Sequence, residues 1–153
     1  MEELVQIAAV GELCEDIYIA EDDSILAREL GGISLNFARA VASLPDTRAH
    51  LIAPVGTDEC GRRLLRALDE SNVHHHVRRF SGESTSQRIR IRGAGERIFD
   101  GFTPGVMSGY TLSEAERELL ATMWLGAVPI SPDTSSFAAD TLAFCHSCGV
   151  KTA

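Results

Sequence analysis

The sequence predicts an α/β fold in which a doubly wound, mainly parallel sheet is flanked by helices. An apolar run at Val5–Val10 is followed by a Gly-Gly pair and an amphipathic helical pattern within residues 30–42. A second apolar run, residues 51–55, is followed by a polar turn and a helical pattern that runs to residues 72–73. Strand, turn and helix in alternation are typical of parallel sheets joined by crossover helices. In such sheets, ligands bind beyond the carboxyl ends of the strands.

The first strand leads to a candidate ligand-binding edge. Val5–Val10 is followed by a glycine, and Asp16 lies shortly beyond it, so the strand delivers a carboxylate to its carboxyl end. Gly31 and Gly32 precede the first helix, where glycine lets a ligand approach the backbone and the first turn offers free N–H groups. Asn36 adds a polar side chain at the start of this helix. A glycine turn before an ordinary core helix explains the Gly-Gly pair equally well, since a lone glycine motif is weak evidence.

The middle of the chain predicts a second strand, a helix and a β-hairpin. Asp58 follows the apolar run of residues 51–55, where it either caps the next helix or contacts a ligand, and capping is the favoured interpretation. Residues 87–92 alternate polar with apolar side chains, which is typical of a half-exposed strand, and residues 97–99 fit the returning strand. We therefore interpret residues 93–96 as a hairpin turn.

The C-terminal third continues the alternation of helices and strands. Thr111 and Glu114 have the spacing of a capping box, which would open a helix to about residue 121. Residues 124–130 are predicted to form an apolar strand. A further helix is expected from residues 132–134 to about residue 146, before a glycine that suits a helix end.

The composition is that of one soluble domain over residues 1–153, since 44% of the residues are hydrophobic and 24% are charged. No run approaches the about 20 apolar residues that cross a bilayer, so we expect no membrane contact. The formal net charge of −8 argues against nucleic-acid binding. The four cysteines lack the regular spacing of secreted domains, which predicts a reducing, cytoplasmic location.

Two further patterns have the spacing of metal ligands. Cys145 and Cys148 are spaced as in zinc and redox sites, but no second cysteine pair completes four ligands. His74, His75 and His76 would point alternately to the two faces of a strand, so a surface position is favoured over a shared metal ion. We therefore predict no metal site.

Three motifs follow one another along the chain: Gly11-x-x-x-x-Asp16, Gly31-Gly32-x-x-x-Asn36-x-Ala38, and Val55-Gly56-x-Asp58-x-x-Gly61. Their order and spacing are specific when taken together. They resemble those of the PfkB or ribokinase-like family of sugar kinases, and the resemblance covers the whole chain. A later stretch, residues 95–107, resembles most closely the fructosamine or fructoselysine kinase branch of the family.

The resemblance implies a sugar-binding site in this chain. Asp16 would accept hydrogen bonds from sugar hydroxyls, because an ionised carboxylate is an acceptor only. Gly31 and Gly32 would let the sugar lie against the backbone, and Asn36 would exchange hydrogen bonds with its hydroxyls. In this family a small β-sheet, the lid, covers the sugar. Arg97 would lie in a turn of the lid, where it either reaches the substrate or is solvated.

The lid strands are expected within residues 17–20, 73–79 and 87–100. Lids of this family often pair between two subunits. The resemblance therefore implies a homodimer that forms through the lid.

The catalytic part of the family pattern is missing from this sequence. In the family, a Gly-Ala-Gly-Asp turn supplies the catalytic aspartate, and the same half of the protein binds ATP and Mg²⁺. Residues 93–96 read Gly-Ala-Gly-Glu, but a catalytic turn should open a helix whose N–H groups hold phosphate charge. An acidic residue that the family often carries after the third strand is also replaced, at residues 129–131. We therefore assign no catalytic residue, and ATP and Mg²⁺ are implied by the family alone.

Two functions are compatible with this pattern. The first is a carbohydrate kinase that transfers the ATP γ-phosphoryl group to a hydroxyl of a sugar or sugar derivative, with this chain supplying the sugar-binding side and lid. The second is a catalytically inactive, truncated fragment that only binds sugar or dimerises through the lid. An interrupted sheet edge would then favour association or marginal stability. A Rossmann dinucleotide-binding domain is disfavoured, because Gly-x-Gly-x-x-Gly does not follow the first strand.

Overall fold

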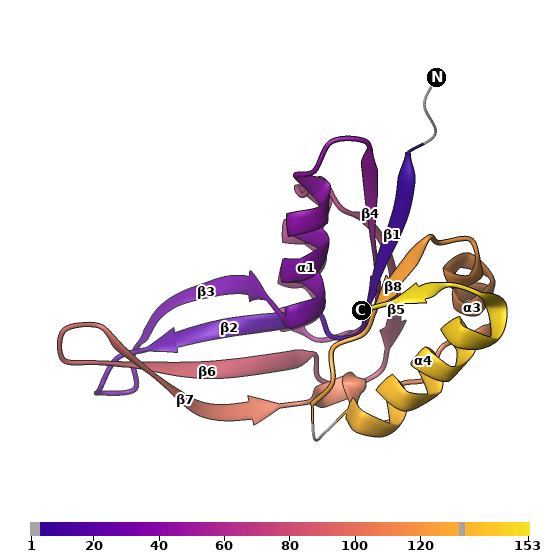
Figure 1. Cartoon of the computed structure of the whole chain (residues 1–153). Coiled ribbons are helices and arrows are strands. Elements are labelled where there is room, and N and C mark those ends of the chain that lie inside the picture. Colours follow the sequence, from indigo (N-terminus) through magenta and orange to yellow (C-terminus); the bar gives the residue numbers. More distant parts are fainter. Residues whose placement is uncertain (1–3, 132–133) are drawn as a thin grey trace.

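Two β-sheets form the framework of the protein in a computed structural model that describes residues 4–131 and 134–153. The larger, which we call the main sheet, is parallel and has the strand order β5-β4-β1-β8-β9. Figure 1 shows the smaller sheet extending away from one side of the main sheet. The strands of the main sheet are β1 (Val5–Val10), β4 (Thr47–Gly56), β5 (His74–Phe80), β8 (Leu125–Ala127) and β9 (Lys151–Thr152).

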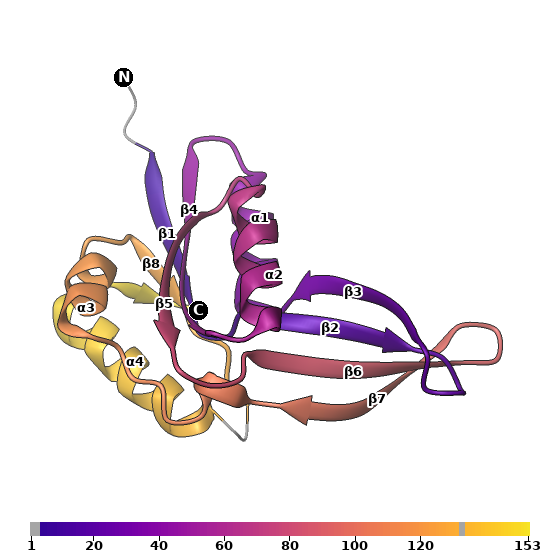
Figure 2. The ribbon, with the colours of Figure 1, turned by 180° about the vertical axis from the view of Figure 1, so that it is seen from behind.

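Helices cover both faces of the main sheet, as Figures 1 and 2 show. On one face lie α1 (Ile33–Ala42) and α2 (Glu59–Asp69), and on the other lie α3 (Glu114–Ala121) and α4 (Ser135–Cys148). This arrangement confirms the predicted α/β fold with a parallel sheet flanked by helices. Among the described residues, no helix is long and apolar enough to span a membrane.

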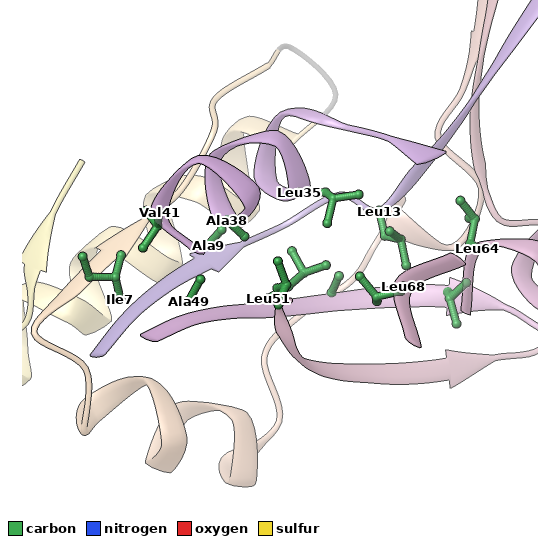
Figure 3. Close-up of a cluster of buried hydrophobic side chains, with 13 residues drawn as sticks. Ile7, Ala9, Leu13, Leu35, Ala38, Val41, Ala49, Leu51, Leu64 and Leu68 are labelled. Atoms are coloured by element: carbon green, nitrogen blue, oxygen red, sulfur yellow. The ribbon is translucent and has the colours of Figure 1, made fainter. Parts of the chain in front are cut away.

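The two faces of the main sheet form separate hydrophobic clusters. Ile7 and Ala9 of β1 belong to the cluster beneath α1 and α2, whereas Ala8 and Val10 belong to the cluster beneath α3 and α4. Figure 3 shows the first cluster, with side chains of α1 facing those of β1 and β4. Leu51 is fully buried there, and burial of such a side chain stabilises the fold by about 1.5–3 kcal/mol. Because both faces are buried, the central strands are continuous apolar runs.

The small sheet has four strands in the order β3-β2-β6-β7. Its central strands β2 and β6 are parallel, while β3 and β7 pair antiparallel at its edges. The turn between β6 and β7 is closed by a hydrogen bond from Gly95 N to Arg92 O at 3.0 Å, which confirms the predicted hairpin. The strands are β2 (Cys14–Ile19), β3 (Ile25–Gly31), β6 (Thr85–Arg92) and β7 (Glu96–Thr103).

The prediction of residues 73–79 as a lid strand is wrong. Residues 74–80 form β5, which pairs in parallel with β4 from His50 opposite His74 to Gly56 opposite Phe80. The α2 crossover returns the chain beside β4, and Val77 packs against the hydrophobic cluster beneath α1 and α2. The fourth strand of the small sheet is instead β3, whose exposed and partly charged sequence gives no clear strand pattern.

The C-terminal third contains the predicted elements with shifted boundaries. The capping box of α3 lies two residues later than predicted, because Ser113 is the N-cap and Glu116 is its partner. Strand β8 has only three residues within the predicted range 124–130. Helix α4 ends at Gly149 in the left-handed conformation, as expected. Residues 132–133, which were predicted to begin this helix, lie outside the described residues.

Candidate functional site

The predicted site residues Asp16, Gly31 and Gly32 lie close together, where the small sheet joins the start of α1. Asp16 lies on β2, and Gly31 is the last residue of β3. A Cβ atom added at Gly31 would lie 2.5 Å from Asp16 Oδ2, so the carboxylate occupies the space that any larger residue would need. The structure therefore places Asp16 directly against the Gly-Gly pair.

Gly32 is the N-cap of α1 and has a φ of 103°, a backbone conformation that L-residues rarely adopt. A Cβ atom there would lie 2.9 Å from the carbonyl oxygen of Glu12. The Glu12 side chain accepts a hydrogen bond from Ile33 N at 3.2 Å, at the positive end of the helix. Asn36 is exposed one turn into α1, where its backbone N–H donates to Gly32 O.

Two other carboxylates, those of Glu29 and Glu12, lie near Asp16. In the antiparallel pair of β2 and β3, Glu29 lies directly opposite Asp16. Burial raises the pKa of Asp16 above its usual range, and the charges of Glu29 and Glu12 raise it further. Arg97 of β7 is exposed, and its guanidinium carbon lies 5.6 Å from the ring centre of Tyr18. The side of the site formed by Asp16, Glu29 and Glu12 therefore offers mainly hydrogen-bond acceptors.

A hollow of about 170 Å³ lies beside the first turn of α1. Ser34 Oγ is buried, and it has no hydrogen-bond partner among the described residues. A Cβ atom added at Gly11 would lie 2.8 Å from this hydroxyl. Pro129 also lines the hollow. Sequence reasoning missed Ser34, and its only signal was a polar residue two positions after the Gly-Gly pair. The full lining is Ala9, Ile33, Ser34, Phe37, Ala127, Val128, Pro129 and Ala153.

Asp58 is engaged in structural hydrogen bonds. Its Oδ1 accepts from Gly61 N at 2.8 Å, which caps α2, and from Ser84 Oγ at 2.6 Å. Its Oδ2 accepts from Ser84 N at 3.0 Å. Burial alone would raise the pKa of Asp58, but hydrogen bonds from Ser84 and Gly61 outweigh burial and hold the pKa below its usual range. The favoured capping interpretation is confirmed.

The remaining candidates do not form a site in the described part of the chain. Residues 93–96 lie at the exposed tip of the small sheet, and a strand follows them rather than a helix. The four cysteines are free, and Cys145 is buried whereas Cys148 is exposed. No group of three or more His, Cys, Asp or Glu side chains among the described residues is arranged to hold a metal ion.

Residues 6–122 match the family model for the pfkB family of carbohydrate kinases. A ribokinase from Giardia lamblia superimposes with a TM-score of 0.76 at 17% identity, over 97% of this chain and 49% of that chain. The Arabidopsis thaliana ribokinase complexed with ribose and ATP has a TM-score of 0.76 at 18% identity, with coverage of 97% and 52%. A fructokinase from Halothermothrix orenii has a TM-score of 0.74 at 15% identity, with coverage of 97% and 56%. The chain thus spans about half the length of these structures. No curated protein is significantly similar in sequence.

Proposed function

The chain belongs to the pfkB family of carbohydrate kinases, and from this membership we propose that it supplies the sugar-binding side of a kinase that phosphorylates a sugar or sugar derivative. The observation that carries the proposal is the contact between Asp16 and the Gly-Gly pair at the start of α1. This contact gathers a carboxylate acceptor and helix N–H donors around one point. Sugar hydroxyls need both kinds of partner.

Each candidate residue has a distinct role in the proposal. Asp16 accepts hydrogen bonds from the hydroxyls, and its raised pKa suits a carboxylate that gains donors only when a sugar binds. Gly31 and Gly32 have no side chain, so the Asp16 carboxylate and the Glu12 carbonyl lie against the start of α1, and the sugar binds beside this backbone. Asn36 exchanges hydrogen bonds with it from the first turn of α1, and Arg97 contacts it from the small sheet, which acts as the lid.

The described residues do not fit ATP and Mg²⁺, although the family is ATP-dependent. The Gly-Ala-Gly-Glu turn at residues 93–96 closes a hairpin, so it cannot present the N–H groups of a helix to a phosphate. No acidic cluster that could hold a metal ion is present in the described ranges. We therefore assign no step of phosphoryl transfer to this chain, and its contribution is to bind and orient the acceptor.

Calorimetry with a panel of neutral sugars and fructosamines tests the proposal. We expect at least one compound to bind the wild-type chain, and Asp16→Asn to abolish that binding. Asp140→Asn is the matched control, because Asp140 lies exposed on α4. Binding that survives in Asp16→Asn, or no binding by any compound, would refute the assignment of an acceptor site.

The second candidate function, a binding module that dimerises through the small sheet, is favoured by exposed apolar side chains on that sheet. Phe99 is 74% exposed, and Ile25 and Leu26 are 53% and 57% exposed. Such side chains on a solvent-facing sheet mark an association surface. We expect a dimer in sedimentation velocity experiments that becomes a monomer in Phe99→Ser. A wild-type monomer at micromolar concentration would contradict this candidate.

A further inference from the structure

Helix α2 is tied by polar side chains to both central strands of the small sheet. At β2, Arg63 donates from Nε to Glu15 Oε1 at 2.7 Å and from Nη2 to Glu15 Oε2 at 2.9 Å. At β6, the N-cap residue Asp58 accepts two hydrogen bonds from Ser84, the residue that precedes the strand. The parallel strands β2 and β6 are therefore both linked to α2 by hydrogen bonds.

Helix α2 is itself fixed to the main sheet. Leu64, which follows Arg63, and Leu68 one turn later are buried in the cluster that Figure 3 shows. A Cβ atom added at Gly61 would lie within 3 Å of the carbonyl oxygen of Gly56, so the start of the helix packs directly on the end of β4. Arg63 therefore belongs to the body formed by the main sheet and its helices. The small sheet is the second body.

Glu15 is buried and depends on its arginine partners. Its side chain is 4% exposed, and Arg28 of β3 donates to the same carboxylate at 2.6 Å. Burial alone would raise the pKa of Glu15, but hydrogen bonds from Arg63 and Arg28 outweigh burial and keep the pKa below its usual range. A buried carboxylate held by a bidentate guanidinium has one favoured geometry, so this contact fixes direction as well as distance.

The two arginines have different mechanical roles. Arg28 and Glu15 both belong to the small sheet, so their ion pair is internal to it. Arg63 and Glu15 belong to different bodies, so their contact crosses between them, as the hydrogen bonds from Ser84 to Asp58 also do. Successive residues of a strand point to opposite faces, and Glu15 therefore faces α2 while Asp16 faces the candidate sugar site.

We propose that Arg63 is a positioning residue, which through Glu15 holds the small sheet and Asp16 in one orientation relative to the main sheet. The part of this inference that concerns sugar rests on the proposed function. The part that concerns orientation does not.

Residual dipolar couplings measured on the ligand-free chain test the orientation. In the wild type we expect amide couplings from both sheets to fit one alignment tensor. In Arg63→Gln we expect two tensors, with weaker alignment of the small sheet. Arg62→Gln is the matched control on the same helix, because within residues 4–131 and 134–153 the Arg62 side chain pairs only with the exposed Glu59.

Arg28→Gln separates positioning from general destabilisation. It removes a guanidinium from the same carboxylate, but it cuts no contact between the two bodies. We expect it to lower the stability while both sheets keep one tensor. If Arg28→Gln and Arg63→Gln loosen the small sheet equally, or if Arg63→Gln retains a single tensor, the inference is wrong.

Sugar affinity gives the second readout. For a compound that binds the wild type, we expect Arg63→Gln to raise the dissociation constant about tenfold, the effect of losing one well-placed hydrogen bond, and Arg62→Gln to leave it unchanged. An unchanged constant in Arg63→Gln would overturn the inference while leaving the proposed function intact. If no sugar binds the wild type, the proposed function fails, and the dipolar couplings still decide the orientation.

Discussion

Lowering the pH from 7 to 5 is expected to destabilise the protein through His50. This side chain lies on β4 and is only 8% exposed. Its Nε2 lies 2.8 Å from Gln6 Oε1, and its Nδ1 lies 3.1 Å from His76 Nε2. Because the amide oxygen can only accept, His50 Nε2 donates to Gln6 and Nδ1 accepts from His76. This chain of hydrogen bonds needs a neutral His50 ring, because a protonated ring has no nitrogen free to accept from His76.

The structure gives the sign and the size of the effect. Burial lowers the pKa of His50 from its usual 6.5 to about 4, and the charges of His76, His74 and Arg48 add to the shift. Between these two values the unfolded chain binds a proton that the folded chain does not. The contribution of neutral His50 to the free energy of unfolding is therefore fully present above pH 6.5 and is lost as the pH falls towards 4. The loss is about 2 kcal/mol at pH 5 and about 3 kcal/mol in full.

Urea unfolding of the wild type and of His50→Gln at pH 7 and pH 5 measures this loss. We expect the wild type to lose about 2 kcal/mol more than His50→Gln over this interval. His75→Gln is the matched control, because His75 faces Asp69 on the other side of β5. Protonation of Glu15 and Asp58 in acid also destabilises the fold, since their pKa values are lowered. This loss is equal in the wild type and in His50→Gln. An equal loss in His50→Gln and the wild type would refute the reasoning.

Three further substitutions test the local structure by urea unfolding at pH 7. Gly32→Ala should cost about 1–3 kcal/mol, because a φ of 103° strains any other residue and a Cβ would press on Glu12 O. Ser84→Ala should cost about 1–3 kcal/mol, because it removes a buried donor to Asp58. Ser113→Ala should cost about 1 kcal/mol through loss of the α3 N-cap. A change below about 0.3 kcal/mol in any of them would contradict the contact assigned to that residue.

The parallel sheet and its crossover helices were predictable because their signals are local. Continuous apolar runs mark β1 and β4, and the Gly-Gly pair marks the start of α1. The hairpin between β6 and β7 was also predictable, from alternation on both sides of a glycine turn. Element boundaries were less certain, as the capping box of α3 shows, because Thr111 and Ser113 are both followed three residues later by glutamate.

The place of β5 could not be read from its own residues. Most of its side chains are half-buried and only His74 and Arg79 are exposed, which is equally typical of an edge strand in either sheet. The sequence did predict that His74 and His76 share one face and His75 the other. The sequence did not predict that His50, which lies more than twenty residues away in the chain, would contact these rings. Only the parallel pairing of β5 with β4 brings these rings together.

The candidate site was predictable in part for the same reason. Asp16 and Gly31 belong to sequence motifs of the family, and the structure brings these two residues into contact. Ser34 and Glu15 carry no motif, and their importance depends on burial and on distant partners such as Arg63. Tertiary contacts of this kind leave little trace in a single sequence.

A titration of the ¹⁵N-labelled chain with sugars, followed by amide chemical shifts, tests whether Asp16 and the Gly-Gly pair bind sugar. We expect saturable shifts at Gly31, Gly32 and Asn36 in the wild type, and none of them in Asp16→Asn. We expect little change at the exposed end of α4. Saturable shifts confined to another part of the chain, or their persistence in Asp16→Asn, would contradict the claim that this edge of the fold is the sugar-binding site.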